Sequence, residues 1–149
     1  MSIQNNLFQK ILLITSELQT VAKNLEIATK TDKNGKPTRS YKAVSEVDIL
    51  NAVKPLEAKY GVMSYPADRE VIDSGFLEKE GYNGTITKSF YLRVKVTYKF
   101  VNVDNPAEQI TVVSYGDGID TGDKATGKAM TYADKYALMK MYKISTGDD

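Results

Sequence analysis

The sequence lacks two residue types on which many enzyme active sites and metal centres depend. None of its 149 residues is cysteine or histidine. Without cysteine the chain can form no disulfide and offers no thiolate to a metal ion. Without histidine it lacks the commonest general base and the commonest metal ligand. Catalysis would therefore have to depend on carboxylates, lysines or hydroxyl groups.

Long hydrophobic runs are missing as well. No run approaches the roughly 18 apolar residues of a membrane span, and the first ten residues, MSIQNNLFQK, show no signal-peptide pattern. We therefore expect a cytoplasmic protein without membrane contact. The length predicts a single domain over residues 1–149.

The net charge is close to zero, but the charges are segregated along the chain. The formal net charge is +1, from 20 basic and 19 acidic residues. Basic residues dominate segments 30–42, 88–99 and 122–143, whereas acidic residues collect in segments 68–80 and 104–120. Such segregation can produce a basic stripe on a nearly neutral protein. Scattered, solvated charge is an equally good interpretation of the composition.

Apolar periodicity predicts two helices in the first part of the chain. Apolar residues recur at steps of three and four from Ile3 to Leu25, which indicates a helix over about 3–28. A basic loop over 29–44 follows, rich in turn-forming residues. A second helix is expected over 45–60, with Ser45 as its cap. Pro55 should kink this helix or divide it into two pieces.

The remaining pattern predicts an antiparallel sheet followed by a long helix. The sheet is expected over 62–115, with segment 75–88 as a mobile loop or hairpin tip. Strict alternation in SFYLRVKVTYKFV gives its clearest strand one core face and one basic, solvated face. The last helix is expected over 121–143, with alanines that let it lie close to the sheet. The fold class is therefore α+β: two N-terminal helices, a three-stranded antiparallel sheet and a C-terminal helix across it.

The stretch GDKATGKA, residues 122–129, resembles a phosphate-binding loop. The position of the Mg²⁺-binding hydroxyl is occupied by Ala129, and no alternating strand and helix series exists to build the parallel sheet that such a loop requires. We therefore interpret the stretch as helical, with Lys124, Lys128 and Lys135 along a basic edge.

Three nearby acids allow two interpretations. Asp117, Asp120 and Asp123 could gather a divalent cation, although their spacing matches no known calcium loop. The favoured interpretation is that Asp120, Thr121 and Asp123 cap the last helix and complement its dipole.

Two long stretches resemble a known protein family. The stretch SYKAVSEVDILNAVKPLEAKYGV and the later stretch SYGDGIDTGDKATGKAMTYADKYALMKMYKISTGDD are similar to the Erf (essential recombination function) family of phage single-strand annealing proteins. The later stretch combines a glycine–acid loop, the lysine-bearing helix and a TGDD end. Family members often continue into a variable tail, so this chain is either a short member or a core domain.

The resemblance implies a function without catalysis. It implies a β-β-β-α core that binds single-stranded DNA, assembles with copies of itself into rings or helical filaments, and anneals strands without ATP or another cofactor in the bacterial host cytoplasm. Annealing needs a DNA backbone held by lysines and arginines, with the bases left free to pair. Proteins that bind single-stranded DNA often stack bases on aromatic side chains as well, although a tyrosine such as Tyr41 is more often a packing residue. The expected DNA-binding residues are Lys36, Arg39, Tyr41, Lys42, Arg93, Lys95, Lys124, Lys128 and Lys135.

Two other functions stay open at the level of sequence. One is a small interaction domain whose basic face docks an acidic partner protein. The other is a Mg²⁺-dependent nuclease that uses Asp117, Asp120 and Asp123.

Overall fold

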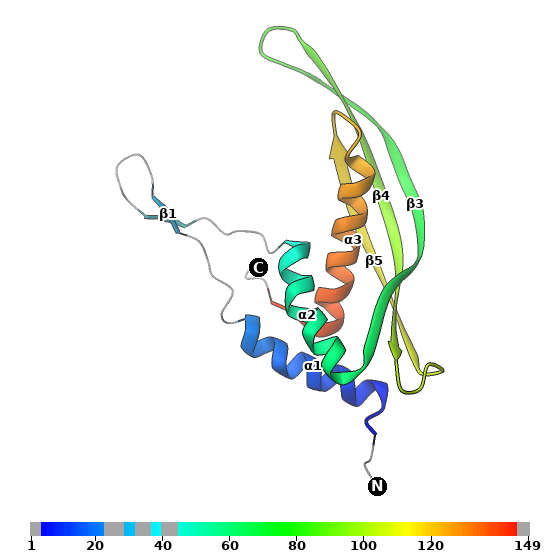
Figure 1. Cartoon of the computed structure of the whole chain (residues 1–149). Coiled ribbons are helices and arrows are strands. Elements are labelled where there is room, and N and C mark those ends of the chain that lie inside the picture. Colours follow the sequence, from blue (N-terminus) through cyan, green and yellow to red (C-terminus); the bar gives the residue numbers. More distant parts are fainter. Residues whose placement is uncertain (1–3, 23–28, 32–36, 40–44, 146–149) are drawn as a thin grey trace.

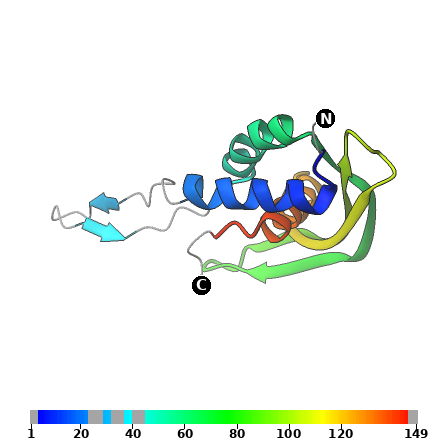
Figure 2. The ribbon, with the colours of Figure 1, turned by 90° about the horizontal axis from the view of Figure 1, so that it is seen from below.

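The molecule consists of an antiparallel sheet with helices on one face. The computed structural model describes residues 4–22, 29–31, 37–39 and 45–145. Within these residues the elements are α1 (Leu7–Ala22), β1 (Thr29–Thr31), β2 (Pro37–Arg39), α2 (Glu46–Tyr60), β3 (Val62–Glu80), β4 (Ile86–Asn102), β5 (Gln109–Asp120) and α3 (Ala125–Tyr142). Figure 1 and Figure 2 show the helices together on one side of the sheet. The predicted α+β class is confirmed.

The sheet has the strand order β3-β4-β5, with antiparallel pairing throughout. The alternation predicted for β4 is also confirmed, because its helix-facing side chains are buried: Leu92, Val94, Val96, Tyr98 and Phe100. We call this side of the sheet the inner face and the opposite side the outer face. In the part of the chain that the structure describes, no element covers the outer face, and Val113 and Tyr115 are about half exposed on it.

The β3–β4 hairpin is longer than the sequence pattern indicated. Segment 75–88 was expected to be a mobile loop or a hairpin tip. It does contain the tip of a hairpin, but β3 continues to Glu80 and β4 begins at Ile86, so most of the segment is strand. The hairpin extends beyond the N-terminal end of α3 (Figure 1). Phe76 and Phe90 are cross-strand partners with ring centroids 5.3 Å apart, and the Lys88 ammonium lies 4.6 Å from the Phe76 ring centroid. Such cross-strand contacts stabilise a hairpin beyond the body of a sheet.

The main core lies where the three helices meet the inner face. The helix residues that contribute most to it are Leu7, Ile14 and Leu18 of α1, Ile49 and Val53 of α2, and Leu138 and Tyr142 of α3. Phe100 of β4 packs edge-on against Tyr142, with ring centroids 5.5 Å apart. The apolar stripe predicted for the first helix is therefore confirmed from Leu7 to Leu18. In the described part of the chain, no helix is long and apolar enough to cross a membrane.

A buried lysine joins α1 to one end of the sheet, where β3 begins and β4 ends. The Lys10 ammonium is almost inaccessible to solvent and donates hydrogen bonds to Asn102 Oδ1 and Asp104 Oδ2, both at 2.6 Å, and to the Gly61 carbonyl at 3.3 Å. A buried ammonium is tolerated only when its donors find acceptors. This cluster therefore fixes the position of α1 against the turns that flank β3 and β4.

Helix α2 has the ends that its sequence predicts. The Ser45 hydroxyl accepts from the Asp48 backbone N–H, and the Asp48 carboxylate accepts from the Ser45 N–H, which completes a capping box. Gly61 ends the helix with φ of 75°, in the left-handed region that favours glycine. The helix passes Pro55 without being divided.

Helix α3 lies so close to β5 that no side chain fits between them. A Cβ atom at Gly116 would lie 2.2 Å from the Ala129 carbonyl oxygen, and one at Gly118 would lie 1.9 Å from the Ala125 carbonyl oxygen. On the helix side of this contact Ala125, Ala129 and Ala133 are fully buried. The close packing expected from the alanines is confirmed, and the two glycines of β5 make it possible.

Several boundaries differ from the sequence-based expectation. The first helix is described from Leu7 to Ala22, and residues 23–28 lie outside the described part of the chain. The expected loop 29–44 contains the paired strands β1 and β2. Strand β5 continues through residues 116–120, which had been assigned to a glycine–acid loop, because its glycines meet the helix backbone rather than form a turn. Helix α3 accordingly begins at Ala125 rather than at residue 121.

Substitution of Gly118 by alanine should destabilise the protein strongly. The added methyl group would overlap the α3 backbone, so the helix must move away from the sheet, and overpacking of this kind costs about 1–3 kcal/mol or more. Urea denaturation of Gly118→Ala measures the loss. The control is Gly127→Ala on α3, where no atom lies within 4 Å of the added carbon and helix propensity favours alanine by up to about 1 kcal/mol. Equal stability of the two variants would contradict the close-packing explanation.

Candidate nucleic-acid interface

The connection between β5 and α3 is organised by one carboxylate. Asp120 Oδ2 accepts the backbone N–H groups of Gly122 at 3.0 Å and Lys124 at 3.2 Å, and Asp120 Oδ1 accepts from the Lys128 ammonium at 2.9 Å. The Lys128 ammonium and the two N–H groups hold the pKa of Asp120 below its ordinary value. Backbone donors that would face a phosphate in a nucleotide-binding loop therefore face a carboxylate of the chain itself.

This geometry corrects the capping prediction. Helix α3 begins after Lys124, and no side chain caps its first turn. Asp120 binds the N–H groups just before the helix instead, because β5 carries it to the inner face beside Lys128. Gly127 and Lys128 lie within the first turn of α3, so they do not form a loop.

The three acids considered for a divalent cation do not converge. Asp117 lies opposite Arg93 on the outer face, and Asp120 lies opposite Phe90 on the inner face. The sheet backbone separates the two carboxylates because consecutive strand residues alternate between faces. The described residues contain no group of three potential metal ligands.

A pocket beside the first half of α3 brings together three of the predicted cations. It has a volume of about 770 Å³. Its lining residues are Ser45, Glu46, Asp123, Lys124, Gly127, Lys128, Thr131, Tyr132 and Lys135. We call it the lysine pocket. Its three lysines differ: Lys124 is exposed, Lys128 is held by Asp120, and Lys135 is only 8% exposed. Only Lys124 has an ammonium with no partner among the described residues.

Two tyrosines on α3 form a feature that the charge-based interpretation missed. Tyr132 and Tyr136 are one helical turn apart, and their ring planes differ by 21° with centroids 6.3 Å apart. The Lys135 ammonium lies 4.9 Å from one ring centroid and 5.0 Å from the other. The spacing Tyr-x-x-x-Tyr with an intervening lysine is the signal in the sequence that could have indicated this cluster.

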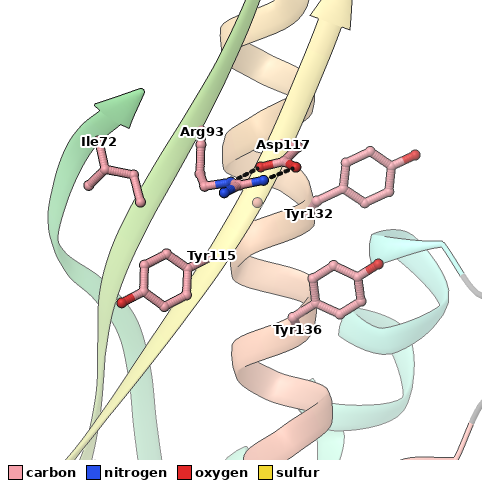
Figure 3. A pocket seen from close by; sticks show the side chains of 7 residues that line it. Ile72, Arg93, Tyr115, Asp117, Tyr132 and Tyr136 are labelled. Carbon is pink, nitrogen blue, oxygen red and sulfur yellow. Dashed lines mark hydrogen bonds and ion pairs between the residues drawn. The ribbon is translucent and has the colours of Figure 1, made fainter. Parts of the chain in front are cut away.

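A second pocket adjoins the two tyrosines at the edge of the sheet. It has a volume of about 580 Å³. Its lining residues are Ile72, Arg93, Tyr115, Gly116, Asp117, Tyr132 and Tyr136. We call it the tyrosine pocket, and Figure 3 shows it. Tyr132 borders both pockets, so the tyrosine pocket adjoins the lysine pocket at this residue.

Arg93 is less available for an anion than its place on a solvated strand face indicated. Its guanidinium forms a two-point ion pair with Asp117, with Nε to Oδ1 at 2.7 Å and the second bond at 3.0 Å (Figure 3). The pair raises the pKa of Arg93 and lowers the pKa of Asp117. Both side chains are more than half exposed, so the pair contributes little to stability but neutralises Arg93 locally.

The outer face as a whole is mixed rather than basic. Cross-strand partners share a face, so the register places four basic and four acidic side chains there: Lys79, Arg93, Lys95, Lys99, Asp68, Glu70, Asp73 and Asp117. Lys95 lies directly opposite Glu70. The basic side of β4 is thus flanked by acids that stand far away in the sequence.

The remaining predicted residues belong to the segment before α2. Lys36, Tyr41 and Lys42 lie outside the described residues. Arg39 ends β2, which pairs only with β1 in a separate two-stranded sheet. Of the predicted residues, the structure brings Lys124, Lys128 and Lys135 together in the lysine pocket. Arg93 lines the adjoining tyrosine pocket.

Comparison with known proteins agrees with the resemblance noted in the sequence. A model of the ERF superfamily matches residues 9–149, nearly the whole chain. No curated protein matches the chain.

Replacement of Asp120 by asparagine should destabilise the start of α3 in a pH-dependent way. Because the folded-state pKa of Asp120 is lowered from 3.8, its carboxylate stabilises the fold above that value, and the contribution is lost as the pH falls through the lowered pKa. We expect a lower Tm for Asp120→Asn at neutral pH and convergence with the unsubstituted protein below pH 3.8. Asp123→Asn is the control, since Asp123 forms no hydrogen bond among the described residues. A Tm difference that does not change with pH would contradict this role of the carboxylate.

Proposed function

The chain belongs to the ERF superfamily, and we propose that it binds single-stranded DNA and anneals complementary strands as a phage recombination protein in the host cytoplasm. Membership of this superfamily indicates a recombination role by annealing rather than a catalytic activity. The match over residues 9–149 carries the proposal, because it spans the helical layer and the sheet together.

Helix α3 offers the chemistry that such binding requires. Its exposed side carries Lys128, Tyr132, Tyr136 and Lys140 at steps of four residues, and Lys124 continues this row just before the helix. The row spans about 24 Å at the rise of an α-helix. Binding without sequence preference needs cations along the DNA backbone and aromatic surfaces for bases. We propose α3 as the centre of the interface, with Lys135 supporting it and with Lys36, Arg39, Tyr41 and Lys42 as further contacts.

We propose that annealing needs no nucleotide. Support comes from the connection between β5 and α3, where the Asp120 carboxylate takes the backbone N–H groups of Gly122 and Lys124. In addition, the position at which a phosphate-binding loop carries its Mg²⁺ ligand is occupied by the buried Ala129. The free energy of base pairing between the complementary strands is then the driving force of the reaction.

We also propose that the protein self-associates into a ring or a helical filament. Large apolar side chains are exposed on two distant surfaces. Phe8 and Leu12 on α1 are 68% and 67% exposed, and Phe76 and Ile86 on the β3–β4 hairpin are both 64% exposed. If different surfaces of two copies meet, the contact repeats from copy to copy and closes into a ring or continues as a filament.

The rival functions have less structural support. A basic face for an acidic partner protein is not found on the outer face, where acids and bases are equal in number. A nuclease that uses Asp117 and Asp120 together would need the two carboxylates on one side of β5, and they lie on opposite sides.

Binding of single-stranded DNA should be independent of sequence and sensitive to salt. We expect the logarithm of the affinity to fall linearly with the logarithm of salt concentration, by about 0.7 for each phosphate contact. Lys124→Ala with Lys140→Ala should weaken binding and reduce this slope, whereas Lys54→Ala with Lys59→Ala on α2 should leave both almost unchanged. Filter binding measures the affinity, and annealing of complementary oligonucleotides without ATP tests the activity. Affinity that is independent of salt, or equal losses in both variants, would contradict the proposal.

Removal of the acid that faces Arg93 should strengthen DNA binding. Asp117→Asn eliminates the two-point ion pair and leaves the guanidinium free for a phosphate, so we expect tighter binding and a salt slope steeper by about 0.7. Asp68→Asn is the matched control. This substitution removes the same charge from the outer face, but Asp68 lies opposite Thr97 and not opposite an arginine. If both variants gain equally, net charge rather than Arg93 accounts for the effect.

A further inference from the structure

The rings of Tyr132 and Tyr136 form a flat exposed surface on α3. The rings are nearly parallel and 6.3 Å apart between centroids, and the two residues are 43% and 40% exposed. Figure 3 shows them one beyond the other along the helix, with Tyr115 and the Arg93–Asp117 pair on the neighbouring strands. Within the described residues neither hydroxyl forms a hydrogen bond.

Lys135 supports this surface rather than extending into solvent. Its ammonium lies about equally far from both ring centroids, at 4.9 Å and 5.0 Å, and the residue is only 8% exposed. A cation held against aromatic rings is attracted by their π electrons. Both rings line the tyrosine pocket, whereas only Tyr132 lines the lysine pocket. The tyrosine pocket is therefore where the two rings are accessible together.

Basic side chains line the pockets on both sides of the rings, although Arg93 is paired with Asp117. Lys124 and Lys128 lie in the lysine pocket, which Tyr132 borders, and Arg93 lies in the tyrosine pocket. A ligand that crosses both pockets therefore meets the lysines, then two aromatic faces, and then an arginine that is paired with Asp117. A single nucleic acid strand has the matching order, because its phosphates alternate with flat bases.

We propose that Tyr132 and Tyr136 are a base-stacking site, at which unpaired bases of a DNA strand lie on the tyrosine rings while neighbouring phosphates contact the lysines of α3. This inference rests on the proposed function. It assigns the recognition of bases to the two tyrosines and leaves the salt-dependent part of binding to the cations. Stacking does not distinguish one base from another, since every base has a π face, which suits a protein that anneals any sequence.

The inference predicts that the protein discriminates between strands with and without bases. The probes are an oligo(dT) and an abasic oligonucleotide of equal length, which has the same phosphates but nothing to stack. We expect oligo(dT) to bind the unsubstituted protein at least tenfold more tightly, a factor equivalent to about 1.4 kcal/mol. Tyr132→Leu with Tyr136→Leu should remove this preference, with abasic binding unchanged. Tyr132→Phe with Tyr136→Phe keeps the rings and should retain it.

A tyrosine at the hairpin tip provides the matched control. Tyr82 is fully exposed, and Tyr82→Leu should bind both probes like the unsubstituted protein. If the unsubstituted protein binds neither probe, the proposed function fails. If it binds both equally, or if the leucine variant keeps its preference for oligo(dT), DNA binding stands and the stacking site is overturned.

A second measurement tests the inference without any substitution. The chain has 10 tyrosines and no tryptophan, so its intrinsic fluorescence comes from tyrosine. Stacking of bases should quench this fluorescence when oligo(dT) binds and leave it unchanged when the abasic strand binds. Equal fluorescence changes with the two probes at saturation would overturn the stacking site, whether or not the leucine variant folds.

Discussion

The contact between the backbones of α3 and β5 is the constraint on which the rest of the structure depends. At Gly116 and Gly118 the helix approaches so closely that a single added carbon would overlap it. This approach fixes the rotation of α3, because only its alanine side can face the strand. The other side therefore presents Lys128, Tyr132 and Tyr136 to solvent, and Tyr132 reaches both pockets. The interface is a consequence of close packing and not only of the charges it contains.

Several basic side chains are already paired within the protein. Arg69 forms a two-point ion pair with Asp134, at 2.9 Å and 2.7 Å, which joins β3 to α3. Lys10 is buried among acceptors, and Lys128 and Arg93 each face an aspartate. A charge that already has an acidic partner offers less to DNA, because binding must first displace that partner. The cations that can contact phosphate are therefore fewer than the basic residues, which favours a shared role for aromatic side chains.

The sequence predicted the candidate interface in part. Lys124, Lys128 and Lys135 do lie together, because residues spaced by three and four positions are neighbours on a helix and the helix itself was predictable. The distinct role of Lys135 was not predictable from its spacing, since its burial depends on the rings of Tyr132 and Tyr136. The acids beside Arg93 and Lys95 were not predictable either, because they come from other strands whose register no local pattern specifies.

The sequence by itself determined the α+β class, the core face of β4, the ends of α2 and the apolar stripe of α1. Each follows from a local rule, either the twofold period of a strand, the 3.6-residue period of a helix, or the hydrogen bonds of a cap. Only the tertiary structure decided that residues 116–120 are a strand, that Asp117 and Asp120 face opposite sides, and that two tyrosines meet Arg93 at one pocket. The physical reason is that a glycine is compatible both with a turn and with a strand under close contact. Whether such a glycine lies in a turn or in a strand depends on what packs against it. Here α3 packs against the two glycines, and its alanines lie so close that no side chain fits between helix and strand.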